Sequence, residues 1–129
     1  MVWEIISLAI STISIVVAVV TFLISHFRTK RVETLQRLDA LFDGYYAVSK
    51  KSVKECYKEW AGLLSRVERF AAAYNGGVYN KRIIKNRAST FLCKLYNDHL
   101  QELIIQRRKQ FKKGDYYHNT EVMVKDLKK

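Results

Sequence analysis

The first 27 residues differ sharply from the rest of the chain in their pattern of hydrophobic and polar positions. A run of 21 residues, Ile5 to Ser25, contains no charged side chain, whereas charged residues recur throughout the chain that follows it. A helix rises about 1.5 Å per residue, so a run of this length crosses a hydrocarbon core of about 30 Å. The pattern predicts two parts, a transmembrane anchor over residues 1–27 and a second region over residues 28–129.

The flanks of the apolar run favour a retained anchor over a cleaved signal peptide, and they set its orientation. A signal peptide has a basic start and a small-residue cleavage site, whereas this chain begins Met-Val-Trp-Glu. Arg28, Lys30 and Arg31 follow the run at once, and no Lys or Arg precedes it. The positive-inside rule therefore predicts a single-pass protein with its N-terminus outside and its C-terminus in the cytoplasm.

Apolar residues after the anchor recur every three or four positions, which predicts helices. The chain has no proline, and its clearest turn signals are Gly44, Asn75-Gly76-Gly77 and Gly114-Asp115. Asn80 is placed to cap a helix that starts just after the second turn. The predicted helices run from the membrane to about residue 43, over about 49–74, over about 80–113 and from about 120 onward. The expected fold class is all-α, with the transmembrane helix continuous with a small antiparallel cytosolic helical bundle.

Each predicted helix carries an apolar face that can contribute to a common core. In chain order, the faces comprise Val32, Leu35, Leu38, Phe42 and Tyr45; Val53, Tyr57, Trp60, Leu64, Val67, Ala71 and Tyr74; Ile84, Ala88, Phe91 and Leu95, widened by Leu92, Tyr96 and Leu103; and Val122, Met123 and Leu127. Leu100, Ile104 and Ile105 fall outside the third face. Either the short fourth helix or another subunit should cover these three residues.

Few polar residues are placed to carry chemistry. Glu68 borders the face of the second helix, and a half-buried carboxylate requires a partner, which we expect to be an ion pair or a tyrosine hydroxyl. His99 is expected at the edge of the core. Cys56, Cys93 and three scattered histidines form no metal-spaced cluster, and no nucleophile elbow or phosphate loop is present. We therefore expect no enzyme, no catalytic residue, no metal and no cofactor.

Small and hydroxylated residues occupy one face of the anchor. This small-residue face comprises Ser7, Ser11, Ser14, Ala18, Thr21 and Ser25, at steps of four and three. In a bilayer, helices associate through close backbone packing and interhelical hydrogen bonds, which such residues permit. Because the chain has one span, the face predicts self-association, with a dry seam favoured over a hydroxyl-lined pore. In the alternative, the hydroxyls bond their own preceding carbonyls and face lipid.

The phase of this face continues past the membrane. Its further positions are Arg28, Val32, Leu35, Asp39, Phe42 and Tyr46. Arg28 and Asp39 on an otherwise apolar seam would set the register of a parallel assembly. Val32, Leu35 and Phe42 are also needed by the chain's own bundle, so the two uses compete.

The region after the anchor is strongly basic, with all 23 Lys and Arg residues of the chain against 11 of its 12 acids. Next to an anionic leaflet such charge is expected, so it does not by itself indicate nucleic acid. Three groups of bases stand out. They are the juxtamembrane group, Arg28, Lys30 and Arg31; the proximal cluster, Lys81, Arg82, Lys85 and Arg87; and the distal cluster, Arg107, Arg108, Lys109, Lys112 and Lys113.

The predicted topology gives these groups different surroundings. The first predicted helix runs away from the membrane, the second runs back toward it and the third runs away again. The proximal cluster, at the start of the third helix, should therefore lie near the lipid surface, where it and the juxtamembrane group should contact anionic head groups. The distal cluster would lie about 40 Å farther out, well beyond a Debye length of about 8 Å. It is a candidate site for an acidic protein or nucleic acid, and Tyr116-Tyr117-His118 beside it could stack on bases. A solvated helix end is the simpler explanation.

The segment LLSRVERFAAAYNGGVYNKRIIKNRA contains a set of turn and packing residues with a known counterpart. The features are the step Glu68-Arg69-Phe70-Ala71, the turn Asn75-Gly76, Tyr79 and the pair Ile83-Ile84. With them the chain resembles a bacterial and phage-associated family of unknown function, whose members have one N-terminal transmembrane helix and a helical cytosolic module. The resemblance implies a bacterial membrane protein from a prophage or anti-phage context, and it brings no catalytic residues.

These patterns together predict a non-enzymatic, self-associating protein of the bacterial inner membrane, acting as a scaffold or as a membrane-perturbing effector in a prophage or phage-defence context. Its expected partners are membrane lipid, further copies of itself and a controlling protein. The alternative is a monomeric tether that presents a basic module to nucleic acid or to an acidic protein. Nucleic acid is the less expected partner, because basic charge near a membrane already has a lipid explanation.

Overall fold

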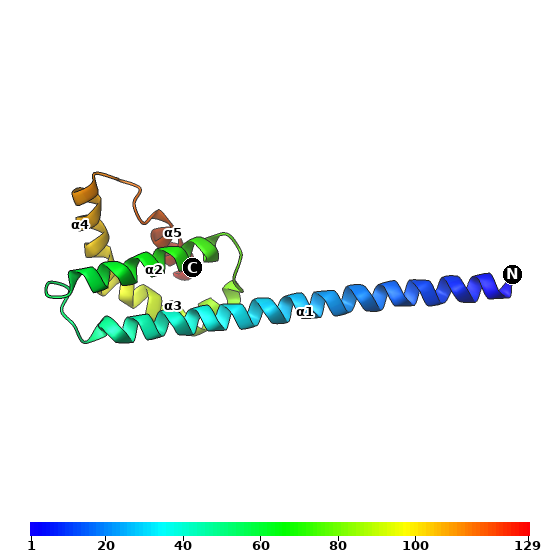
Figure 1. Cartoon of the computed structure of the whole chain (residues 1–129). Helices are drawn as coiled ribbons and strands as arrows, with labels where there is room; N and C mark the ends of the chain where they lie inside the picture. The colour runs from blue at the N-terminus through cyan, green and yellow to red at the C-terminus, as the bar shows by residue number, and fades with distance from the viewer.

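The structure of the protein, a computed structural model, describes all 129 residues and contains helices and no strands. The elements in chain order are α1 (Val2–Ser49), α2 (Tyr57–Asn75), α3 (Lys81–Leu95), the π-helical turn η1 (Tyr96–Leu100), α4 (Gln101–Phe111) and α5 (His118–Leu127). Figure 1 shows α1 as a long rod, with the other helices gathered around its C-terminal part. The all-helical class and the long apolar N-terminal helix are therefore confirmed.

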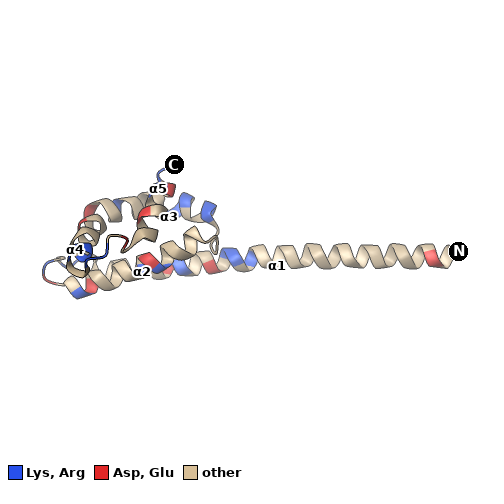
Figure 2. Cartoon of the chain, turned by 90° about the horizontal axis from the view of Figure 1, so that it is seen from above, with Lys and Arg blue, Asp and Glu red and all other residues tan.

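The N-terminal part of α1 projects away from the rest of the protein. Every residue from Met1 to Thr29 is exposed, and the first buried side chain is Thr34. In Figure 2 this projecting part carries a single acidic residue near the N-terminus, and its bases begin where it meets the other helices. The helix does not break at residue 27, so one rod joins the apolar run to the helical module, residues 28–129.

Within the module, α1 buries Thr34, Leu38, Leu41, Gly44 and Val48. The prediction that this helix ends near residue 43 is wrong, because Gly44 is a packing residue rather than a helix end. A Cβ at Gly44 would lie 3.1 Å from Nη1 of Arg66 and 3.7 Å from the Leu63 side chain of α2. The missing side chain lets α2 approach α1 closely at this position.

The second helix begins at Tyr57, later than the predicted start near residue 49. Residues 50–56 form turns, in which the Cys56 amide donates to the Ser52 carbonyl at 2.9 Å. The Trp60 indole donates to the Lys51 carbonyl at 3.1 Å and holds the turn on α2. Val53 packs half-buried against the core from this turn. Its spacing from the next apolar residues therefore matches a helical pattern, although Val53 itself lies outside the helix. The predicted core positions from Trp60 to Tyr74 are all buried.

The third predicted helix is present, but it is divided. Asn80 caps it as predicted, because its side-chain oxygen accepts from the Ile83 amide at 3.2 Å. The π-helical turn η1 separates α3 from α4, and Figure 1 shows α4 turning away from the direction of α3. Extra residues in a helical turn are a recognised cause of such bends. His99 lies in this turn at the edge of the core, with its ring 4.7 Å from that of Trp60.

The last helix, α5, packs on α2 and α3. Leu100 and Ile104 belong to the same buried cluster as Met123 and Leu127, so the chain itself covers them, whereas Ile105 stays 47% exposed. The predicted burial of Val122 is wrong, because Val122 is exposed and the neighbouring Val124 is buried instead. The α5 helix also begins at His118 rather than near residue 120.

Glu68 has a different partner from the ion pair or tyrosine hydroxyl that the sequence predicts. Its carboxylate accepts from the Asn119 amide at 2.8 Å and from the Thr120 amide and hydroxyl at 3.2 Å each. These groups lie in the first turn of α5, whose amides have no partners within the helix. Glu68 on α2 therefore caps α5 from a distant part of the chain and adds a negative charge at its N-terminus.

Candidate functional site

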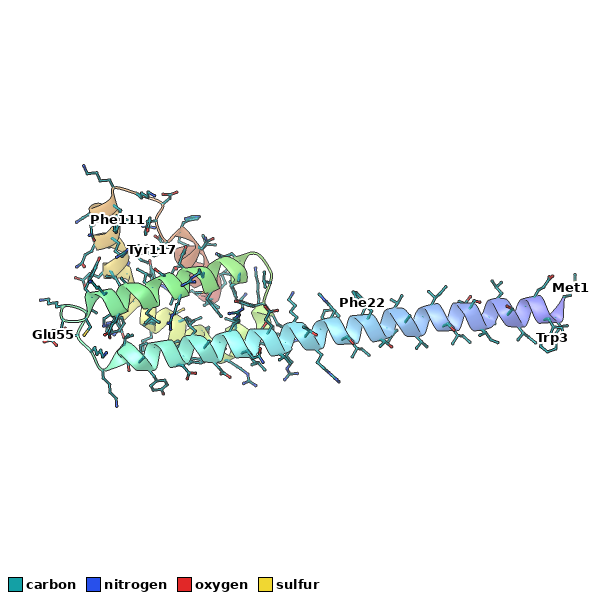
Figure 3. The ribbon with its side chains drawn as sticks, viewed as in Figure 1. Met1, Trp3, Phe22, Glu55, Phe111 and Tyr117 are labelled. Atoms are coloured by element: carbon teal, nitrogen blue, oxygen red, sulfur yellow. The ribbon has the colours of Figure 1, made fainter.

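The exposed apolar helix is the most unusual surface of the protein. One helix, α1, is long and apolar enough to cross a membrane, and none of its apolar window is buried inside the module. Phe22 in the middle of this stretch is 69% exposed, and Trp3 near its start is 82% exposed. In Figure 3 both side chains project outward from the helix, away from the module. An apolar surface of this extent in a folded chain marks a site of contact with lipid or protein.

The six residues of the small-residue face are all exposed on this rod. Ser14 donates its hydroxyl to the Ile10 carbonyl at 2.9 Å, and Thr12, on another face, donates to Leu8 in the same way. Ser14 is therefore satisfied within its own helix and presents mainly its small size to a neighbour.

The start of α3 is fixed beside α1 just after the juxtamembrane group. The Asn80 amide donates to the Thr34 hydroxyl at 2.9 Å, and this hydroxyl donates to the Lys30 carbonyl at 2.7 Å. The chain Lys30–Thr34–Asn80 thus ties the proximal cluster to the end of the module nearest the apolar rod. Figure 2 shows the bases of α1 and of the first turns of α3 at this end.

Two members of the proximal cluster also stabilise the module. The ammonium group of Lys85 lies 3.7 Å from the Asp126 carboxylate, and Lys81 lies over the Tyr74 ring, 5.2 Å from its centre. Tyr74 donates to Asp126 at 2.5 Å. This hydrogen bond and the nearby lysines lower the pKa of Asp126, while burial and the same hydrogen bond raise the pKa of Tyr74. Arg82 and Arg87 are exposed and have no ion pair.

The distal cluster consists of two arginines that interact with other residues of the fold and three exposed lysines. Arg107 donates to the Tyr117 hydroxyl at 2.6 Å and lies 4.9 Å from the centre of the Phe111 ring. Arg108 donates to the Tyr116 carbonyl at 2.8 Å and pairs with the Glu121 carboxylate. Both arginines therefore hold the segment between α4 and α5 in place. Lys109, Lys112 and Lys113 remain exposed.

The tyrosines beside the distal cluster are mostly occupied within the fold. Tyr117 is only 7% exposed, and the ring of Tyr116 stacks on that of Phe111 at 5.9 Å. The predicted base-stacking surface is therefore smaller than the sequence implies.

A further group of bases converges in the fold although the sequence separates it. Arg37 on α1 and Arg66 and Arg69 on α2 line a hollow of about 570 Å³ together with Phe70 and Tyr79. No local pattern in the sequence indicates this site, because neither helix carries a dense basic run there. The pairing of α1 with α2 creates it.

No group of three or more His, Cys, Asp or Glu residues is placed to hold a metal ion. No protein-family model, no curated protein and no solved structure matches the chain. The family resemblance of the segment from Leu63 to Ala88 therefore stays a prediction.

Proposed function

We propose that the protein is a non-enzymatic, single-pass protein of the bacterial inner membrane that self-associates through its apolar helix. In this proposal the N-terminus lies outside, and the module is a small antiparallel bundle on the cytoplasmic side. The assembly acts as a scaffold or as a membrane-perturbing effector, in a prophage or phage-defence context. The observation that carries the proposal is the complete exposure of the apolar stretch on a helix that continues unbroken into the module.

The arrangement of faces around α1 supports self-association. At 100° per residue, the small-residue face and the buried line through Thr34, Leu38 and Leu41 lie on roughly opposite sides of the helix. Two copies can therefore meet along the small-residue face without their modules colliding. The continuation of this face is open in part, since Val32 is 47% exposed and Tyr46 is 71% exposed, whereas Phe42 packs within the module with its ring 4.6 Å from that of Phe91.

The position of the bases supports the membrane orientation. The juxtamembrane group follows the apolar run, and the Thr34–Asn80 hydrogen bond brings the proximal cluster to the same level. Basic residues within a Debye length of an anionic leaflet gain about 1 kcal/mol each. This arrangement favours a module that rests its basic end on the cytoplasmic surface.

The test is the mass of the purified full-length protein in detergent, compared with a variant in which Ser11 and Ser14 are both changed to Leu. The larger side chains should hold the helix backbones apart and lower the oligomer mass. Changing Ile13 and Val17 to Leu, on other faces, is the matched control and should leave the mass unchanged. Changing the two serines to Ala keeps the close approach and removes only hydroxyls, which contribute about 0.6 kcal/mol each in membranes. A dry seam should therefore tolerate Ala.

An assembly unaffected by the Leu changes would contradict the seam. A protein that is monomeric from the start would favour the tether, whose remaining basic surface is the exposed lysine group of the distal cluster.

A further inference from the structure

The arginine-lined hollow between α1 and α2 has the composition of an anion site. Three guanidinium groups and no carboxylate line it. The ion pairs of the protein, Lys51–Glu59, Lys85–Asp126 and Arg108–Glu121, involve none of these arginines. Arg107 and Arg108 of the distal cluster show the contrast, because both are fully engaged within the fold. Arg37, Arg66 and Arg69 therefore have no ion-pair partner within the protein.

Two further residues contribute donors at the lining of the hollow. Tyr79 is 7% exposed, its ring lies 5.0 Å from that of Phe70, and Arg37 and Glu33 both lie near enough to its hydroxyl to act on its pKa, which burial raises. Arg66 lies across α1 over Gly44, where a Cβ would approach its Nη1 to 3.1 Å. A glycine at this position therefore leaves space for the Arg66 guanidinium group, between the arginine-lined hollow and a neighbouring hollow that Gly44 itself lines.

The hollow also connects with the membrane-facing end of the module. A second hollow of about 620 Å³ shares Arg37 with the first and extends along α1 to Arg28. Glu33 lines this second hollow and Glu59 lines a third one that shares Arg66, so carboxylates lie on both sides of the first hollow but none belongs to its lining. Arginine forks match the oxygens of carboxylates and phosphates in geometry and charge, and three of them together suit the higher charge of a phosphate group.

We propose that the hollow binds a phosphate-bearing anion, with Arg37, Arg66 and Arg69 contacting the phosphate oxygens and the Tyr79 hydroxyl donating a further hydrogen bond. A soluble phosphorylated molecule and the head group of a phosphorylated lipid present the same chemistry to this site. The site belongs to the module, so it does not depend on self-association of the apolar helix.

The first experiment is calorimetric titration of the full-length protein with sodium pyrophosphate, in an uncharged detergent at physiological salt. We expect saturable binding that weakens by about tenfold for each of Arg37→Gln, Arg66→Gln and Arg69→Gln, because each change removes charge-assisted hydrogen bonds. Tyr79→Phe should weaken binding severalfold. Gly44→Ala should also weaken it by displacing Arg66.

The matched control is the triple change of Lys54, Lys58 and Lys94 to Gln, which removes the same charge from exposed positions outside the hollow. It should leave pyrophosphate affinity within twofold of the wild-type value. Equal losses in this control and in a variant that combines Arg37→Gln, Arg66→Gln and Arg69→Gln would overturn the proposal, because they would show diffuse attraction to a basic surface. Absence of saturable binding by the wild-type protein would overturn it too. Arg66→Lys keeps the charge without the fork, so weakened binding with an unchanged melting temperature separates recognition from folding.

The source of the phosphate is distinguished in lipid nanodiscs. Pyrophosphate affinity is compared in discs of phosphatidylcholine with a matched share of either phosphatidate or phosphatidylglycerol. A selective loss of affinity with phosphatidate shows that a lipid phosphate occupies the site. Equal affinity in both discs assigns the site to a soluble anion.

Discussion

Glu68 offers a direct test of how the last helix is held on the module. Changing Glu68 to Ala removes the acceptor of the Asn119 amide and of two groups of Thr120, a residue that is fully buried. Hydrogen bonds to a charged group contribute about 1.5–3 kcal/mol each, and loss of a helix cap costs about 0.5–2 kcal/mol. These contributions overlap because they share one carboxylate, so we expect a loss of about 3 kcal/mol in the free energy of unfolding.

The assay is thermal unfolding of the full-length protein in mild detergent, followed by the fluorescence of buried Trp60. A loss of about 3 kcal/mol should lower the melting temperature by more than about 10 °C in a domain of this size. Glu68→Gln keeps one acceptor and should lie between Glu68→Ala and the wild type. Glu55→Ala, in the exposed turn before α2, is the control and should change stability by less than about 0.5 kcal/mol.

Amide hydrogen exchange locates the effect. The amides of α5 should exchange faster in Glu68→Ala, because its first turn has lost its cap. If Glu68→Ala melts like Glu55→Ala and its α5 amides keep their protection, the capping interaction contributes nothing and the reasoning is refuted.

Four further predictions concern pH, lipid contact and topology. Because the pKa of Asp126 is lowered in the folded state, its carboxylate stabilises the fold above about pH 4, and this stability is lost as the pH falls through the folded-state pKa. In a plot of melting temperature against pH, Asp126→Asn should therefore reduce the fall on the acid side. The raised pKa of Tyr74 gives stability that is present below about pH 10 and lost as the pH rises, so Tyr74→Phe should flatten the alkaline limb. Changing the proximal cluster to Gln should weaken binding of residues 28–129 to anionic vesicles by about 1 kcal/mol per charge, while the same change in the distal cluster should matter much less; equal losses would contradict the antiparallel arrangement. In a cysteine-free background, a cysteine at Val2 should label from outside intact cells and one at Lys129 should not; the reverse pattern would exclude the proposed orientation.

The sequence predicted those parts of the fold that depend on local signals. The Asn80 cap and the core positions from Trp60 to Tyr74 follow from short-range patterns, because helical spacing and capping chemistry act within a few residues. Gly44 was misread as a turn because its role depends on Arg66 and Leu63 of another helix. The π-helical turn at His99 has no short-range signal of this kind and was not anticipated.

The candidate sites show the same division between local and long-range information. The small-residue face and the basic clusters are visible as spacings along the chain. By contrast, Arg107 contacts Tyr117 and Arg108 pairs with Glu121 only because the turn after α4 brings these partners back beside the arginines. The arginine-lined hollow depends on which face of α1 meets α2, and single-sequence periodicity does not determine that pairing.

The unbroken course of α1 makes the apolar run and the module a single mechanical part. The helix has 48 residues, which corresponds to a shaft of about 72 Å, and the chain has no proline to kink it. A continuous helix fixes the rotational position of the module relative to the apolar run. One residue inserted after Thr29 would turn the module by about 100°, and seven inserted residues would return it to within about 20° of its original position. Any rotation of the apolar run about its own axis must therefore turn the module, and its arginines, about the same axis.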